Sequence, residues 1–295
     1  MNVELRHLRA LAAIGDEGTL TGAAEVLHIG QPALSRTLVQ LEGRVGTRLV
    51  ERTTRSLALT EAGRRLYEHA HRILNQLDDA LLEVRAGTRP LRLGFAHTVL
   101  GALTVPLLQD WRDTRPDTPV RVHRRGDPVE ALRRGDIDAA LLRTEPPTAP
   151  DLRVLALMRE RRVAALPDGD PLAASGSLRL EDLADRDVAL CTTAASTGPG
   201  LWPEGRRPRT VEVADVDEWL AAIATGEAVG VTAEGTVHGH PYPGVRYVPI
   251  SDAPPVTVHL VWPEVPTHPA TGAFAEHCTG ALETNGPLSP GTSGQ

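Results

Sequence analysis

The chain has 295 residues, 41% of them hydrophobic, which is long enough for two domains and ordinary in composition for a globular protein. Its apolar runs are far shorter than the roughly 18 residues that span a bilayer, and its amphipathic N-terminus lacks the pattern of a secretory signal. Its two cysteines, Cys191 and Cys278, are too few for a disulfide framework. We therefore expect a cytoplasmic protein that is neither exported nor inserted in a membrane.

The net charge of -7 is unevenly distributed along the chain. Residues 1–90 carry 12 arginines against 11 acidic residues, whereas the remainder carries 19 against 27. Residues 31–60 contain five arginines and only two acidic residues, and the chain contains no lysine. The lack of lysine is best explained by codon bias in a GC-rich bacterial genome, although arginine also suits bidentate contact with phosphate or guanine. The uneven charge makes the N-terminal part, and not the acidic remainder, the candidate for a polyanionic partner.

Three short helices are predicted before residue 46. Apolar residues recur at helical spacing over residues 4–14, and Thr19 can cap a second helix over residues 20–27. Pro32 lies in the first turn of a third helix, where its missing N–H costs nothing.

The third helix has two distinct faces. Its apolar face carries Leu34, Leu38, Leu41 and Val45. Its outer face carries Pro32, Ser35, Arg36 and Val39. A short helix, a glycine-containing turn and a helix with a polar outer face form a helix-turn-helix, whose second helix fits the major groove of DNA.

Two short strands and a long helix follow. Residues 49–50 and 56–59 predict strands that flank an arginine-containing tip, which is a wing suited to the phosphate backbone. Thr60 can cap a helix that reaches about residue 86, and its apolar residues recur every three or four positions. This repeat favours a coiled-coil seam between two chains.

From residue 91 short strands alternate with helical runs. Strands are predicted at LRLGFA, PVRVH, IDAALLR, DVALCTT, AVGVTAE, VRYVPI and PVTVHLVWP. Helices are predicted at LGALTVPLLQDWRDT, DPVEALRRG and VDEWLAAIATG. This alternation predicts an α/β doubly wound fold, which binds ligands at the carboxyl ends of its strands.

The chain resembles the LysR-type transcriptional regulators over nearly its whole length. The resemblance is carried by the run from LRHLRALAAIGDEGTLTGAAEVLHIGQPALSRTL to SLALTEAG, and later by GDIDAALLR and IATGEAVGVTAE. It implies a winged helix-turn-helix, a long linker helix and a two-lobed effector domain similar to type 2 periplasmic binding proteins. The implied partners are promoter or operator double-stranded DNA, a small-molecule effector, further copies of the chain as a dimer of dimers, and RNA polymerase.

The resemblance also implies boundaries. A DNA-binding domain is expected at 1–59, a linker helix at 60–87, a hinge at 88–90, an effector domain at 91–283 and a disordered tail at 284–295. Within the effector domain, lobe I is expected at about 91–160 and 263–283, and lobe II at about 161–262.

Site residues follow from the same placement. The DNA-contacting residues are expected to be Gln31, Pro32, Ser35, Arg36, Arg52 and Arg55. The effector-lining residues are expected to be Thr98, Asp127, Arg143, Thr193 and Thr232. The dimer seam is expected to contain Leu66, Ile73 and Leu77. The carboxylate of Asp127 is poorly suited to bind an anionic effector. Arg143 either offsets this negative charge or is only an exposed charge at the end of a strand.

The two-lobed fold is also compatible with other functions. A cytoplasmic solute-binding protein or an enzyme on the same two-lobed fold is the alternative, but the sequence contains no evident catalytic constellation. Cys191 lacks a second cysteine nearby, so a buried strand residue is favoured over a redox sensor. His238 and His240 lack further ligands close in sequence, so no metal and no cofactor are expected.

Overall fold

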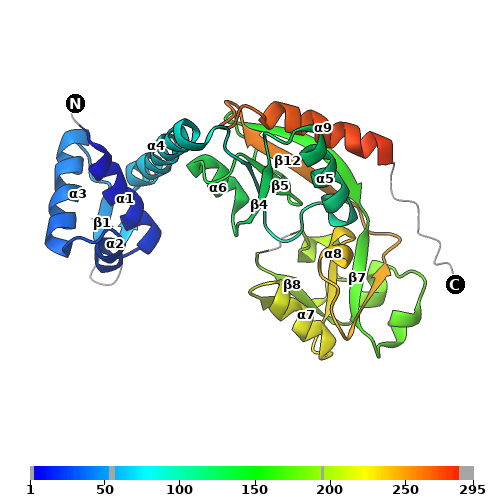
Figure 1. Ribbon diagram of the computed structural model, residues 1–295. Coiled ribbons are helices and arrows are strands. Elements are labelled where there is room, and N and C mark those ends of the chain that lie inside the picture. Colours follow the sequence, from blue (N-terminus) through cyan, green and yellow to red (C-terminus); the bar gives the residue numbers. More distant parts are fainter. Residues whose placement is uncertain (1–2, 53–56, 194–195, 286–295) are drawn as a thin grey trace. The chain divides into compact units, whose positions relative to one another are not determined.

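The computed structural model describes residues 3–52, 57–193 and 196–285. Contacts divide the chain into two compact units, one of residues 1–89 with 130–136 and the other of residues 90–129 with the rest of the chain from 137. Figure 1 shows the elements of each unit. No helix within the described ranges has the length and apolar character needed to cross a bilayer.

The first unit begins with the three expected helices. They are α1 (Leu5–Glu17), α2 (Leu20–Val26) and α3 (Gln31–Val45). The strands β1 (Val50–Arg52) and β2 (Leu57–Leu59) pair antiparallel, and α4 (Glu61–Ala86) follows. The two strands on either side of the wing tip, and the long helix after them, are therefore present where the sequence predicts them.

Side-chain caps fix the starts of two helices. The Thr19 hydroxyl accepts a hydrogen bond from the backbone N–H of Gly22 at 3.1 Å, and the Thr60 hydroxyl accepts one from Gly63 at 2.9 Å. Each bond satisfies an N–H that has no partner inside its helix. Both predicted caps are confirmed.

The core of this unit is formed by the apolar faces of the helices. Leu11, Ile14, Leu34, Leu38 and Leu41 are essentially inaccessible to solvent. The Glu42 carboxylate accepts hydrogen bonds from the backbone N–H groups of Leu49 and Val50 at 2.8 and 3.2 Å. These bonds fasten β1 to α3, so the wing and the third helix are held together.

The second unit contains two five-stranded sheets. The lobe I sheet has the order β4-β3-β5-β12-β6. Its strands are β3 (Leu91–Phe95), β4 (Val120–Arg124), β5 (Ala139–Leu142), β6 (Leu152–Glu160) and β12 (Val256–Pro263). The helices α5 (Thr104–Thr114) and α9 (Thr271–Asn285) pack together against it (Figure 1), and Trp111 meets Phe274 edge-on at 5.2 Å. The helix α6 (Pro128–Arg134) joins β4 to β5.

The lobe II sheet has the order β11-β7-β10-β8-β9. Its strands are β7 (Arg162–Pro167), β8 (Asp187–Cys191), β9 (Arg209–Val213), β10 (Val229–Ala233) and β11 (Val245–Pro249). The helix α7 (Val216–Ala224) covers one face, and the short α8 (Gly235–Gly239) follows β10. In each lobe one strand runs antiparallel to its neighbours: β12, the returning strand, in lobe I, and β7, the first strand, in lobe II. The other pairs, β4-β3-β5 and β10-β8-β9, are parallel.

The predicted lobe boundary at residue 262 is wrong. β12 pairs with β5 and β6 of lobe I, so lobe II ends before Val256. The chain leaves lobe I after Glu160 and returns through residues 250–255, which include Pro254 and Pro255. The expected tail also begins two residues too early, because α9 continues to Asn285; residues 286–295 lie outside the described ranges.

Candidate functional site

The outer face of α3 carries the side chains expected to meet DNA. Gln31, Pro32 and Arg36 are exposed, and Ser35 is half-buried. Val39 is 60% exposed although it is apolar, and an exposed methyl group on such a helix suits contact with a thymine methyl. The outer face is thus polar with one apolar contact point.

The basic residues around α3 have different positions. Arg55 lies outside the described residues, and of Arg52 only the backbone, at the end of β1, is described. Arg44 hydrogen bonds Glu4 at 3.3 Å and contacts the buried His7, so it holds α1 to α3. The positive charge of this segment that faces solvent is therefore smaller than the arginine count suggests.

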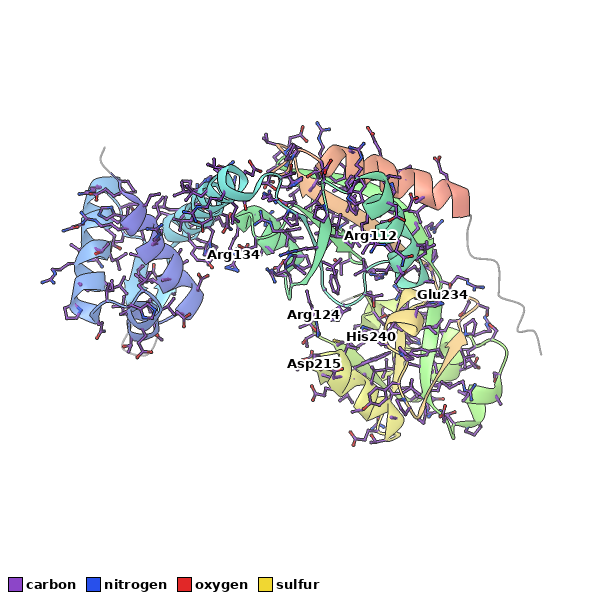
Figure 2. All side chains as sticks on the ribbon, in the orientation of Figure 1. Arg112, Arg124, Arg134, Asp215, Glu234 and His240 are labelled. Atoms are coloured by element: carbon purple, nitrogen blue, oxygen red, sulfur yellow. The ribbon has the colours of Figure 1, made fainter. Side chains whose placement is uncertain are left out.

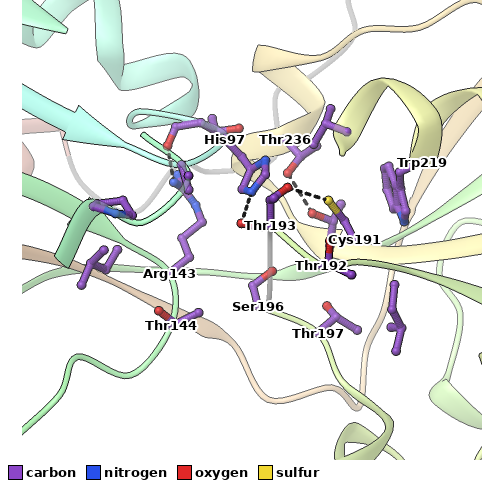
Figure 3. Close-up of a pocket in the computed structure, with 18 of the residues that line it drawn as sticks. His97, Arg143, Thr144, Cys191, Thr192, Thr193, Ser196, Thr197, Trp219 and Thr236 are labelled. Carbon is purple, nitrogen blue, oxygen red and sulfur yellow. Dashed lines mark hydrogen bonds between the residues drawn. The ribbon is translucent and has the colours of Figure 1, made fainter. Parts of the chain in front are cut away.

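In the second unit a cavity of about 360 Å³ lies between the lobes (Figure 3). It is lined where β3, β4, β5, β8 and β10 end, which is where an α/β sheet binds ligands. All five expected effector residues line it: Thr98, Asp127, Arg143, Thr193 and Thr232. The structure thus brings together residues that lie up to 134 positions apart.

Arg143 is saturated by protein groups. Its guanidinium forms a two-point ion pair with Glu160, both bonds 2.8 Å long, and donates to the carbonyls of Thr98 and Val99. The two side chains are 12% and 3% exposed. Arg143 is therefore a buried structural cation, which differs from both expected roles of offsetting Asp127 and of an exposed charge.

Hydroxyl groups dominate the polar lining, and most already have partners. The hydroxyls of Thr192 and Thr193 donate to the carbonyl of Ala214 at 3.3 and 3.1 Å. The hydroxyls of Thr232 and Thr236 bond each other at 2.8 Å. Thr98 is different: it is 6% exposed and its hydroxyl has no hydrogen-bond partner within the described structure.

His97 reaches across the cleft. Its Nε2 donates to the carbonyl of Thr193 (Figure 3), and its own carbonyl accepts from Nε2 of His240 at 3.1 Å. Burial, and then the nearby charges of Arg124, His240 and Arg143, hold the pKa of His97 below its usual value. Figure 2 labels Arg124 and His240, which come from opposite lobes.

The cavity also contains apolar residues that the sequence analysis did not single out: Leu142, Val216 and Trp219. Cys191, expected to be a buried strand residue, ends β8 but is only half-buried and lines the cavity. Val216 and Trp219 lie at the start of an amphipathic helix. The helical spacing of its apolar residues predicts that the two side chains are buried, but it does not predict that they line the cavity. Cys191 meets the Thr193 hydroxyl at 3.3 Å.

The expected dimer residues lie along α4. Leu66 packs partly against the core of the DNA-binding domain, Ile73 is 44% exposed, and Leu77 is half-buried. Further along the helix Leu81, Leu82 and Val84 are also exposed. A long helix with so many exposed apolar residues has a surface suited to a partner helix.

A helix-turn-helix unit followed by a two-lobed domain with a ligand-sized cavity defines a ligand-responsive transcriptional regulator. Residues 5–64 match the bacterial regulatory helix-turn-helix proteins of the lysR family, and residues 85–283 match the LysR substrate binding domain. The chain belongs to the LysR family.

Individual relatives agree with this assignment. The HTH-type transcriptional regulator CatR of Pseudomonas putida is 38% identical over 84% of this chain and 83% of CatR. The nitrogen assimilation regulatory protein nac of Escherichia coli (strain K12) is also 38% identical, but this chain spans only 50% of its length. Among solved structures, full-length CbnR complexed with its target DNA covers 95% of this chain and 100% of CbnR at a TM-score of 0.68 and 23% identity, which is a likeness of fold.

Proposed function

We propose that this protein is a cytoplasmic transcriptional regulator that binds operator DNA through α3 and the wing, and that a small molecule in the cleft modulates this binding. The observation that carries the proposal is the joining, in one chain, of a helix with an exposed polar face to a domain with a cavity at its strand ends. Further copies of the chain and RNA polymerase are the expected protein partners.

The alternative is a solute-binding protein or an enzyme on the two-lobed fold. Neither function would explain the exposed polar face of α3, whereas residues 5–64 match a helix-turn-helix family of bacterial regulatory proteins. The relatives reported above are regulators, which supports a role without catalysis. Turnover of a metabolite by the purified chain would favour the enzyme instead.

The test is a gel-shift titration on the intergenic region upstream of the gene. Arg36→Ala should weaken specific binding by about 1 to 3 kcal/mol, the usual size of a lost base or close phosphate contact. Arg112→Ala is the matched control, because Arg112 is an exposed arginine on α5 in the other unit. Equal affinity for the two variants would remove Arg36 from the DNA-binding surface.

A further inference from the structure

The charged groups around the cleft leave little to hold an anion. Arg143 is saturated by Glu160 and two carbonyls. Arg162, behind the lining residues Ser196 and Thr197, donates to the Thr197 hydroxyl and to the carbonyls of Ser196 and Pro254 at 2.8 to 3.0 Å. Arg124 donates to the carbonyl of Ala96 at 3.3 Å. The guanidinium groups of Arg143 and Arg162 are thus already occupied by protein oxygens, and that of Arg124 is exposed to solvent, where water and salt screen its charge.

The start of α7 is also unsuited to an anion. Carboxylates already gather there: Asp215, the N-cap, accepts from the N–H of Glu218 in the first turn at 2.9 Å, and Glu218 accepts from the N–H of Ala214, just before the helix, at 2.6 Å. Asp127 adds another carboxylate to the lining. A carboxylate ligand would therefore meet negative charge at the positions where a helix start usually attracts it.

His97 defines what the ligand must offer instead. A carbonyl only accepts, so the bond to Thr193 places the proton of His97 on Nε2. The lowered pKa keeps the ring neutral at pH 7, which leaves Nδ1 with a lone pair and no proton. Nδ1 is buried and has no hydrogen-bond partner in the described structure, as is true of the Thr98 hydroxyl. A buried acceptor without a donor is unfavourable, and a ligand donor would satisfy it.

We infer that the cleft takes an uncharged molecule that donates an N–H to Nδ1 of His97, with an amide as the defining group and an apolar body against Trp219 and Leu142. A cationic donor fits less well, because the positive charge of Arg124 lies near the ring. Nδ1 is closed to water in this arrangement, so binding at Nδ1 requires the cleft around His97 to open, and that opening is part of the same proposal. This inference rests on the proposed regulatory function and adds the class of the effector.

The test compares three probes of nearly the same shape on the full chain: benzamide, benzoate and benzylamine, which are neutral, anionic and cationic. Titration calorimetry should show benzamide binding at least tenfold more tightly than either of the others. His97→Phe should lose this preference, whereas His238→Phe, on the exposed part of α8, should keep it. Tighter binding of benzoate or benzylamine, or no binding of benzamide, would overturn the inference.

A second measurement does not depend on the variants folding. Nitrogen-15 spectra of the imidazoles should show His97 neutral at pH 7 with its proton on Nε2, and benzamide should shift the Nδ1 resonance. A proton on Nδ1, or a charged ring, would overturn the inference. Gel shifts on operator DNA are recorded in parallel, because loss of DNA binding contradicts the regulator proposal, whereas a preference for benzoate with DNA binding intact contradicts only the ligand class.

Discussion

At the scale of single residues, the ion pair of Arg143 and Glu160 matters most for the cleft. A buried pair is costly to form and far more costly to break, because the remaining charge has no equal partner. The two carbonyls that also accept from Arg143 belong to Thr98 and Val99, so the pair holds in place the segment that forms part of the cleft.

Glu160→Leu should therefore lower the free energy of unfolding of the effector domain by about 3 kcal/mol or more. The matched control is Glu264→Leu, which breaks a two-point pair with Arg153 whose bonds are 2.7 and 2.9 Å long. Those side chains are 49% and 57% exposed, so water and salt screen the pair and little stability should be lost. Urea unfolding followed by tryptophan fluorescence measures both, and equal losses would contradict the role of burial.

The sequence could place Arg143 at the end of a strand but not predict its partner. Glu160 lies 17 positions away on β6, a strand that the sequence interpretation did not recognise. Thr98, by contrast, follows a clear strand directly, so its place at a strand end was predictable. Residue types and the local spacing of apolar residues show where a strand ends. Which distant residues pair with each other depends on the order of the strands in the sheet, which the sequence does not give.

At the scale of elements, three strands were missed: β6, β7 and β9. β9 is an edge strand whose residues are mostly exposed, and RTVEV has no buried face to create an alternating pattern. β7 is buried on both faces and short, so its AAL run resembles a helical segment equally well. The central parallel strands have a stronger pattern, and they were predicted.

The joint between β1 and α4 depends on one glycine. A Cβ built on Gly63 would lie 1.9 Å from the carbonyl oxygen of Leu49, so the backbone must move to admit any side chain. Gly63→Ala should destabilise the DNA-binding domain by about 1 to 3 kcal/mol.

Gly43→Ala is the control for this change. Gly43 is also inside a helix, but its added Cβ meets nothing within 4 Å. This variant should be more stable by about 0.5 to 1 kcal/mol, because alanine favours the helix. Thermal unfolding followed by circular dichroism compares the stabilities of the two variants. If Gly63→Ala were as stable as the wild type, the backbone between β1 and α4 would be able to move and accept a side chain at little cost.

The exposed apolar residues of α4 predict a seam between two chains. Ile73→Asp would place a charge in that seam without a partner and should convert dimers into monomers at micromolar concentration. Sedimentation of the full chain measures the change, with Gln76→Asp, an exposed polar position of the same helix, as the control. Unchanged association of Ile73→Asp would place the seam elsewhere.

At the scale of the whole molecule, an effector acts only through different affinities for two arrangements of the assembly. A difference of about 1 to 3 kcal/mol shifts promoter occupancy or bending rather than switching it completely. Thr98→Val keeps the side-chain volume and removes the buried hydroxyl. We expect it to lose the response to effector while basal DNA binding persists.

Footprints of wild type and Thr98→Val on the operator, with and without a responsive metabolite, measure this effect. A mutant footprint that changes length with effector as the wild-type footprint does would remove Thr98 from the response.

The register of β6 against β12 has an evolutionary consequence. Glu160, the last residue of β6, pairs directly with Val256, the first residue of β12. Lobe II therefore lies between the two arms of what is otherwise a β-hairpin, as one contiguous insertion that begins and ends at neighbouring points. An insertion of this kind can be exchanged by recombination at two adjacent positions, with the lobe I sheet and the DNA-binding domain left intact. New inducer specificities could thus arise in this lineage by replacing one half of the cleft while the other half and its operator stay the same.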